Sequence, residues 1–164
     1  MTQDKDIAVH DNPVWRDRAN YILQADLSGH GLPGRFEQLW AQDLGDGTFQ
    51  LCCLPFFTYG YALGDVVRVE PSEGRFRSVL GPLVSRSEWN LLRVAFRDRR
   101  VKDARHEELH AALAASGQPH EWRRGGLVSI GFEGPIPEDI REPVNRLAAD
   151  GLVQWEWGRD LPVR

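Results

Sequence analysis

The stretch GLVSIGFEGPIPEDIREPVNRLAADGLVQWEW, residues 126–157, decides the fold class of the C-terminal half. Residues 126–132 predict a strand, because apolar and β-branched side chains cluster between glycines. Residues 135–150 predict a helix, since apolar side chains repeat at helical spacing and Gly151 follows as a stop signal. Residues 152–157 alternate apolar and polar side chains, which is typical of a strand with one buried face.

The segment before this stretch adds one strand and one helix. Residues 90–96 are apolar and predict a strand, and residues 103–116 predict a helix whose apolar face carries Leu109 and Leu113. The order is then strand, helix, strand, helix, strand. A βαβαβ order predicts an α/β sandwich close to a ferredoxin-like layer.

The first half of the chain has the pattern of a small β structure. Strand-like runs separated by Gly/Pro turns predict a bent antiparallel sheet of the SH3-like kind, and they cover residues 20–27, 35–44, 48–55, 66–70 and 75–80. Trp40 alternates with polar neighbours and is expected in the core. Asp46-Gly47 fits a hairpin turn, and Gly64-Asp65 predicts a tight turn with positive φ at the glycine.

Together these patterns predict an α+β protein in which two subdomains pack as one unit. Residues 1–19 are expected to form a flexible N-terminal tail, because they are polar and lack periodicity. Residues 20–84 are expected to form the small β subdomain, and residues 85–164 the α/β sandwich.

Composition narrows the class of partner. The 164 residues are 41% hydrophobic, and the net charge of −4 lies in the first 84 residues while the remainder is balanced. Nucleic-acid binding is therefore not favoured, because neither half has a net positive field. The sequence lacks a long apolar run and an apolar signal segment at the N-terminus, so no membrane contact and a cytoplasmic location are expected.

The motif His106-Glu107-Glu108-Leu109-His110 matches H-E-x-x-H, in which two histidines on one helix face hold zinc. The turn before it is solvated, and a third ligand would have to be a distant acid such as Glu121. We interpret His106 and His110 as the polar shoulder of an amphipathic helix. No metal and no cofactor is expected.

A catalytic site is the weaker alternative. Cys52 and Cys53 lie in a predicted strand, where one would point into the core and the other to the opposite face. Cys53 is a candidate nucleophile only with a nearby base, for which His30 in the glycine-rich loop is the candidate. A deep pocket lined by Cys53, His30 and Tyr59 would favour this alternative. A cysteine in a strand is more often a small buried hydrophobe.

Aromatic and arginine side chains supply the candidate binding residues. Trp122 stands next to Arg123, and these residue types are favoured at interface centres, although a junction between the two halves would use the same residues. In the run from Phe56 to Tyr61, we expect the two phenylalanines in the core. Tyr59 and Tyr61 are expected at the surface, because a tyrosine hydroxyl can stay hydrated while its ring packs.

Three groups of residues together resemble a known family: Phe36-Glu37-Gln38-Leu39-Trp40, Cys52-Cys53-Leu54-Pro55-Phe56-Phe57 and Ala62-Leu63-Gly64-Asp65-Val66-Val67. The chain is similar to an uncharacterised bacterial family of small domains of unknown function over about residues 20 to 157. The resemblance implies no particular reaction. Small bacterial domains of this kind include immunity proteins that bind a toxin and block it.

The favoured function is therefore a non-catalytic cytoplasmic binding protein whose partner is another protein, of immunity or antitoxin type. A small enzyme centred on Cys53, His30 and Tyr59 is the first alternative. A nucleic-acid-binding module is the second, and the charge balance opposes it.

Overall fold

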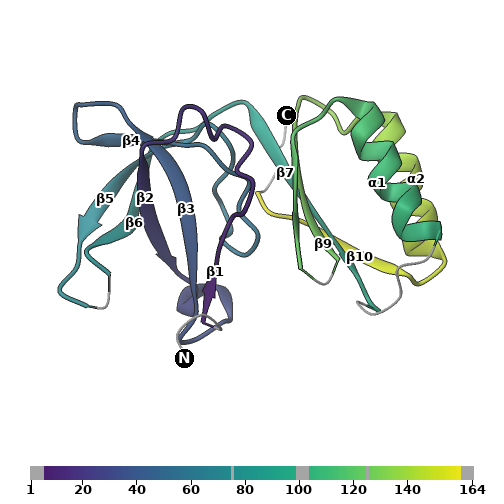
Figure 1. The fold of residues 1–164 in the computed structure, drawn as a ribbon, viewed down its shortest axis with the longest axis horizontal. Helices are drawn as coiled ribbons and strands as arrows, with labels where there is room; N and C mark the ends of the chain where they lie inside the picture. Colours follow the sequence, from purple (N-terminus) through teal and green to yellow (C-terminus); the bar gives the residue numbers. More distant parts are fainter. Residues whose placement is uncertain (1–5, 75, 99–103, 125, 160–164) are drawn as a thin grey trace.

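The computed structural model describes residues 6–74, 76–98, 104–124 and 126–159. Two sheets lie side by side in it: a strongly bent sheet on the left of Figure 1 and a four-stranded sheet with its helices on the right. The predicted α+β class, with a bent N-terminal sheet and a ferredoxin-like C-terminal layer, is confirmed.

The N-terminal sheet closes on itself. Its strands lie in the order β1-β3-β2-β6-β5-β4, and β4 also pairs with β3, so the ring is complete. The bounds are β1 Ile7–Ala8, β2 Tyr21–Asp26, β3 Phe36–Asp43, β4 Thr48–Leu51, β5 Val66–Pro71 and β6 Ser78–Ser85, with a short 3₁₀ turn at Ser28–His30. We call this half the barrel. Closure leaves few free strand edges, as is usual for small β structures.

The alternation of β3 differs from the expectation in one respect. Leu39 and Ala41 point into the barrel core and are fully buried, whereas Trp40 is half-buried on the other side. Glu37 lies on the same inner face as Leu39 and is also fully buried. A carboxylate therefore occupies a core position of the barrel.

The C-terminal half contains one more strand than the βαβαβ order predicted. Its elements are β7 Trp89–Phe96, α1 Ala104–Ser116, β8 His120–Arg123, β9 Leu127–Glu133, α2 Glu138–Ala149 and β10 Val153–Trp157. The sheet order β10-β7-β9-β8 is antiparallel throughout, which makes a complete βαββαβ layer. Both helices cover one face of this sheet (Figure 1), and the core between them includes Val94, Leu113, Ile130 and Leu147.

Residues 6–19 are not the flexible tail that their composition predicted. β1 pairs in parallel with the start of β3, and the amide of Trp15 donates to the carbonyl of Cys52 at 3.0 Å. His10 is 2% exposed. The segment packs because its few apolar and aromatic side chains fill the boundary between the halves, where Val14 and Trp15 contact a buried cluster. Residues 1–5 of the predicted tail lie outside the described residues.

In the described part of the chain, neither α1 nor α2 has the length and apolar character needed to cross a bilayer.

The turn at Gly64 gives the first prediction. Gly64 has φ +79°, and an added Cβ would lie 3.3 Å from both Ser87 Cβ and Trp15. Gly60 has φ +86° with nothing within 4 Å. We expect Gly64→Ala to lower the free energy of unfolding by roughly 1–3 kcal/mol through backbone strain and crowding. Gly60→Ala, which has the strain alone, should cost less when both are measured by urea unfolding. Equal losses would contradict the close packing at Gly64.

Candidate functional site

The segment between β4 and β5, residues 52–63, lies where the barrel meets the four-stranded sheet. It is not a strand, because β4 ends at Leu51. Cys53 nevertheless packs in the barrel core together with Leu51, whereas Cys52 is not part of that core. Both cysteines are fully buried. Leu54 and Leu63 pack with Leu91 of β7 in a small cluster that joins the halves.

The buried Glu37 carboxylate holds this segment by its main chain. One oxygen accepts the amide of Phe56 at 2.5 Å. The other accepts the amide of Phe57 at 3.1 Å, and both the amide and the hydroxyl of Thr58 at 2.9 and 2.7 Å. Several donors aimed at one buried carboxylate satisfy it without water, so the barrel can tolerate a charge in its core.

His10 joins this carboxylate to the other half of the protein. Its Nε2 lies 2.9 Å from Glu37 Oε1 and its Nδ1 lies 2.8 Å from Glu121 Oε1 on β8. Burial lowers the pKa of His10, but its bonds to Glu121 and Glu37 outweigh burial and raise the pKa from 6.5 to about 9. His10 is therefore protonated near neutral pH, and both ring N–H groups donate. We call His10, Glu37 and Glu121 the ion cluster.

Both carboxylates of the ion cluster reach the same segment. Glu121 accepts the amide of Leu54 at 2.5 Å through its second oxygen. Burial by itself would raise the pKa of Glu37. The hydrogen bond and positive charge of His10 oppose this effect, as do the hydrogen bonds from Thr58 and the Phe56 amide, and the pKa falls from 4.5 to about 2. Glu37 is therefore ionised at any physiological pH. The cluster locks the N-terminal segment, the barrel and the four-stranded sheet together.

Arg93 of β7 continues the polar contacts toward the surface. It donates to the carbonyl of Thr58 and lies 3.6 Å from the Glu156 carboxylate. Its guanidinium carbon lies 4.6 Å from the ring centre of Tyr59, and the Tyr59 hydroxyl donates to Glu156 at 2.7 Å. Burial lowers the pKa of Arg93, while Glu37 and Glu156 oppose this effect.

A second buried ion pair ties the end of the described chain to the barrel. Arg159 contacts Asp65 through two nitrogens, at 2.5 and 2.8 Å, and donates to the Ser87 carbonyl at 3.1 Å. Asp65 also accepts the amides of Ala62 and Ser87. The predicted Gly64-Asp65 turn is therefore fixed by a bidentate arginine contact.

The candidate catalytic residues Cys53 and His30 have different surroundings. His30 stacks on Tyr59, with ring centres 5.8 Å apart, and its Nδ1 accepts the Tyr59 amide at 3.3 Å. Cys53 packs in the barrel core. Burial raises the pKa of the Cys53 thiol well above its ordinary range, and nearby Glu121 and Glu37 add to this effect. A thiol in this environment stays protonated and is a poor nucleophile.

In the aromatic run from Phe56 to Tyr61, two residues, Phe57 and Tyr61, differ from the expected division between core and surface. Tyr59 is 41% exposed and Phe56 is buried, as expected. Phe57 is half-buried, with the Arg123 guanidinium 5.4 Å from its ring centre. Tyr61 packs against the barrel core and donates its hydroxyl to the Gly81 carbonyl at 3.2 Å. Tyr61 is therefore largely a packing residue.

Trp122 and Arg123 line a hollow between the edges of the two sheets. We call it the β8 hollow. It has a volume of about 460 Å³ and is lined on the β8 side by Trp122, Arg123 and Arg124, and on the barrel side by Ile7, Val9 and Asp11. Val9 is 38% exposed. An aromatic residue, two arginines and aliphatic side chains thus face one concave surface.

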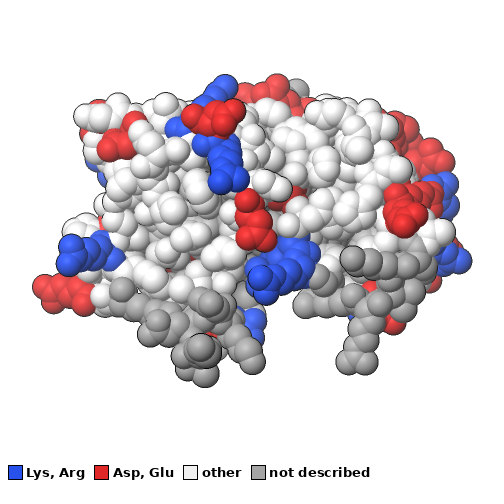
Figure 2. All heavy atoms as spheres, in the orientation of Figure 1, with Lys and Arg blue, Asp and Glu red and all other residues white. Residues whose placement is uncertain are grey.

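A second depression, which we call the β10 groove, lies along β10 where it faces residues 56 and 57. It has a volume of about 630 Å³ and is lined by Phe57, Arg93, Arg97, Gln154, Trp155 and Glu156, among others. Figure 2 shows acidic and basic groups side by side along the boundary between the halves, with uncharged areas around them. On this face, the two signs of charge are mixed and do not form a continuous basic surface.

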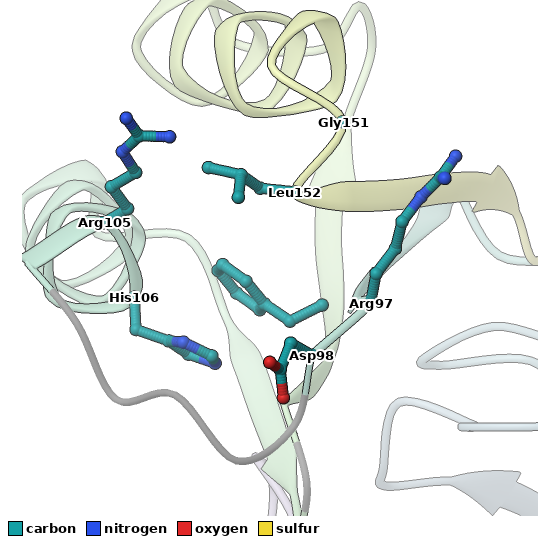
Figure 3. Close-up of a pocket in the computed structure, with 7 residues that line it drawn as sticks. Arg97, Asp98, Arg105, His106, Gly151 and Leu152 are labelled. Carbon is teal, nitrogen blue, oxygen red and sulfur yellow. The ribbon is translucent and has the colours of Figure 1, made fainter.

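The two histidines of the H-E-x-x-H motif lie against aromatic rings. His106 stacks on Phe96 and His110 stacks on Trp122, each with ring centres 3.6 Å apart. Figure 3 shows His106 beside Asp98 and Arg105 at a hollow of about 190 Å³. Within the described ranges, no group of three His, Cys, Asp or Glu side chains is arranged so that it could hold a metal ion.

The sequence interpretation missed the ion cluster. The sequence patterns place His10 in a tail and Glu37 at a polar position of a strand, and they indicate Glu121 only as a distant acid. Glu37 lies two residues before buried Leu39 on the same strand face, and this spacing was the one signal that could have indicated a buried carboxylate.

The fold and the site define a class of two-part α+β protein. In it, a barrel and a ferredoxin-like layer are joined by buried ion pairs, and depressions lie along their boundary. The chain belongs to the family described as domain of unknown function DUF4265, whose model matches residues 37–155. The predicted resemblance to a family of uncharacterised domains is thereby confirmed.

A solved structure shares the fold. It is described as a novel crystal structure of a hypothetical protein from Neisseria gonorrhoeae. The match covers 85% of this chain and 96% of the Neisseria chain. The TM-score is 0.62 at 18% sequence identity, which supports the fold and nothing more specific. A search of curated proteins finds no match.

The ion cluster gives a prediction about stability. Glu37→Gln leaves His10 with one carboxylate and weakens the bonds to residues 56–58. Breaking a buried ion pair in this way costs about 3–5 kcal/mol of unfolding free energy. The matched control is Glu133→Gln on an exposed position of β9, which should change stability by no more than about 0.5 kcal/mol. Urea unfolding of both variants is the measurement, and similar small losses would show that the cluster contributes little.

The pKa of His10 gives a prediction about pH. The folded pKa of about 9 exceeds the ordinary value of 6.5. The contribution of His10 to stability is therefore complete below pH 6.5 and is lost as the pH rises through 9. Wild-type protein should lose more unfolding free energy between pH 6 and pH 9 than His10→Gln, which cannot titrate there. Parallel pH profiles of the two proteins would mean that the pKa of His10 is not raised in the folded state.

Proposed function

We propose that the protein is a non-catalytic binding protein that holds a partner protein at the β8 hollow. The observation that carries this proposal is that Trp122, Arg123 and Arg124 line one side of a hollow whose other side is aliphatic. Tryptophan and arginine carry much of the binding energy at protein interfaces, usually in pockets surrounded by apolar contacts. The hollow also receives residues from both halves, so its shape depends on the ion cluster that fixes them together.

The charges on the hollow indicate the kind of partner. Arg123 and Arg124 are adjacent, and Asp11 is the acidic side chain on the opposite wall. A segment with carboxylates near the arginines and an apolar side chain over Val9 would match this surface. Arginine suits such carboxylates because its planar fork binds them in a bidentate manner.

The protein is thus proposed to act by occupying its partner, as an immunity or antitoxin protein does. Small size and acidic net charge support this narrower form. A cytoplasmic location is part of the proposal, and it is supported by two cysteines that are both free and buried. The proposal includes no reaction, because the buried Cys53 thiol and the stacked His30 lack the features of a nucleophile and base.

Site-specific photocrosslinking in the source cell tests the proposal. A benzophenone amino acid at Val9 should give one discrete protein adduct, and the same group at Val84, which is 48% exposed on the barrel, should not. Adding Arg124→Glu should reduce the Val9 adduct by about tenfold, since removing a charged contact costs about 1.4 kcal/mol or more. Arg77→Glu, an equal charge change on an exposed barrel residue, is the matched control.

Two outcomes would contradict the proposed site. Adducts of equal pattern from Val9 and Val84 would indicate nonspecific contacts. A discrete Val9 adduct that Arg124→Glu leaves unchanged would indicate a partner that does not use the arginines of the hollow.

A further inference from the structure

β10 is the edge strand opposite β8, and its backbone offers hydrogen bonds to a further strand. The amide of Arg97 donates to the carbonyl of Leu152, and the amide of Gly158 donates to the carbonyl of Leu91, each at 2.9 Å. In an antiparallel ladder, alternate residues face the paired strand. The main-chain groups that face away from β7 therefore belong to Val153, Trp155 and Trp157. In the part of the chain that the structure describes, no strand pairs with this side.

The edge of β10 lacks the features that usually protect such strands. Natural edge strands carry lysine, proline or a bulge that prevents pairing with another chain. β10 contains Val-Gln-Trp-Glu-Trp, and its register against β7 is uninterrupted over all five residues. Trp155 is 43% exposed. By contrast, β8 ends in Arg123 and is followed by Arg124, so two β8 edges would bring like charges together.

We propose that β10 pairs antiparallel with β10 of a second copy of this chain, around a two-fold axis at Trp155. The two four-stranded sheets then become one continuous sheet. Pairing of this kind is isologous, because each copy contributes the same surface. It uses the edge opposite the β8 hollow, so it does not depend on the proposed partner.

The sequence of β10 is complementary to itself in this register. Each outward-facing residue meets an outward-facing residue of the second copy, so the main-chain donors and acceptors match. On the helix side, Val153 lies opposite Trp157 of the second copy, a small side chain against a large one. On the barrel side, Gln154 lies opposite Glu156, and the amide can donate to the carboxylate.

The neighbouring registers are less favourable. Moving the axis to Glu156 places the two Glu156 carboxylates directly opposite each other, and like charges in that position are destabilising. Moving it to Gln154 removes Trp157 from the ladder. The register with its axis at Trp155 therefore avoids facing carboxylates and keeps all five residues of β10 in the ladder.

The faces on either side of β10 leave room for the second strand. On the helix side, a hollow of about 210 Å³ is lined by Ile136, Trp155 and Trp157. On the barrel side, Gln154 and Glu156 line the β10 groove. Side chains of an added strand alternate between the two faces, and each set has an adjacent depression to occupy.

Sedimentation equilibrium of the purified full chain over micromolar concentrations tests the proposal. Wild-type protein should form a dimer. In the Gln154→Glu variant, the new carboxylate of each copy faces Glu156 of the other copy, which gives two pairs of like charges in the dimer. The dissociation constant of the dimer should rise on the order of tenfold. Adding Glu156→Gln restores an amide opposite each carboxylate, so the double variant should recover the wild-type dissociation constant.

A backbone variant provides an independent readout. Trp155→Pro removes an outward-facing N–H that makes no bond within the sheet, which an edge strand tolerates. It should give a monomer with an unchanged far-UV circular dichroism spectrum. If this variant does not fold, the Gln154→Glu and double variants still decide the question.

Two results would overturn the proposal. A monomeric wild-type protein at every concentration would show that β10 is not a self-association edge and would leave a strand from another protein as its occupant. A dimer that Gln154→Glu does not weaken would place the contact elsewhere on the molecule.

Discussion

A single protonated imidazole, that of His10, lies between two buried carboxylates that come from different halves of the protein. Glu37 belongs to the barrel and Glu121 to the four-stranded sheet, and each is 4% exposed or less. Without the imidazole, two negative charges would be buried close together with no counter-charge between them, which is among the most costly arrangements in a protein interior. The position of the two halves relative to each other therefore depends on a residue of the N-terminal segment, just after β1.

The carboxylates also determine the path of the chain between the halves. Residues 52–63 have no regular ladder, so their amides need acceptors, and Glu37 and Glu121 supply them at Leu54, Phe56, Phe57 and Thr58. The Arg93 side chain donates a hydrogen bond to the carbonyl of Thr58. A segment without secondary structure is thus held as firmly as a strand, which allows Tyr59 and Phe57 to border depressions of fixed shape.

Regular elements could be predicted from the sequence because hydrophobic periodicity is a local property. The two helices and the strands with a clear apolar face were found within a few residues of their observed bounds. β8 was not, since His120-Glu121-Trp122-Arg123 has no apolar alternation and is a strand only because β9 pairs with it. On β3, alternation with polar neighbours predicted Trp40 in the core, but the barrel interior takes Leu39 and Ala41. The candidate site was found in part: Trp122 and Arg123 do line a hollow, while the ion cluster joins residues 27 to 111 positions apart, a distance over which sequence patterns carry no signal.

The buried pair between Asp65 and Arg159 has a consequence for synthesis of the chain on the ribosome. Asp65 fixes a turn of the barrel, yet its arginine is among the last residues described, and Glu121 also emerges well after the barrel strands. Domains generally fold as units in the order in which they are translated. Here the barrel leaves the exit tunnel with the charge of Asp65 uncompensated, so its native state is completed only after Arg159 has been released. The N-terminal half is first in sequence but cannot be first to fold to completion.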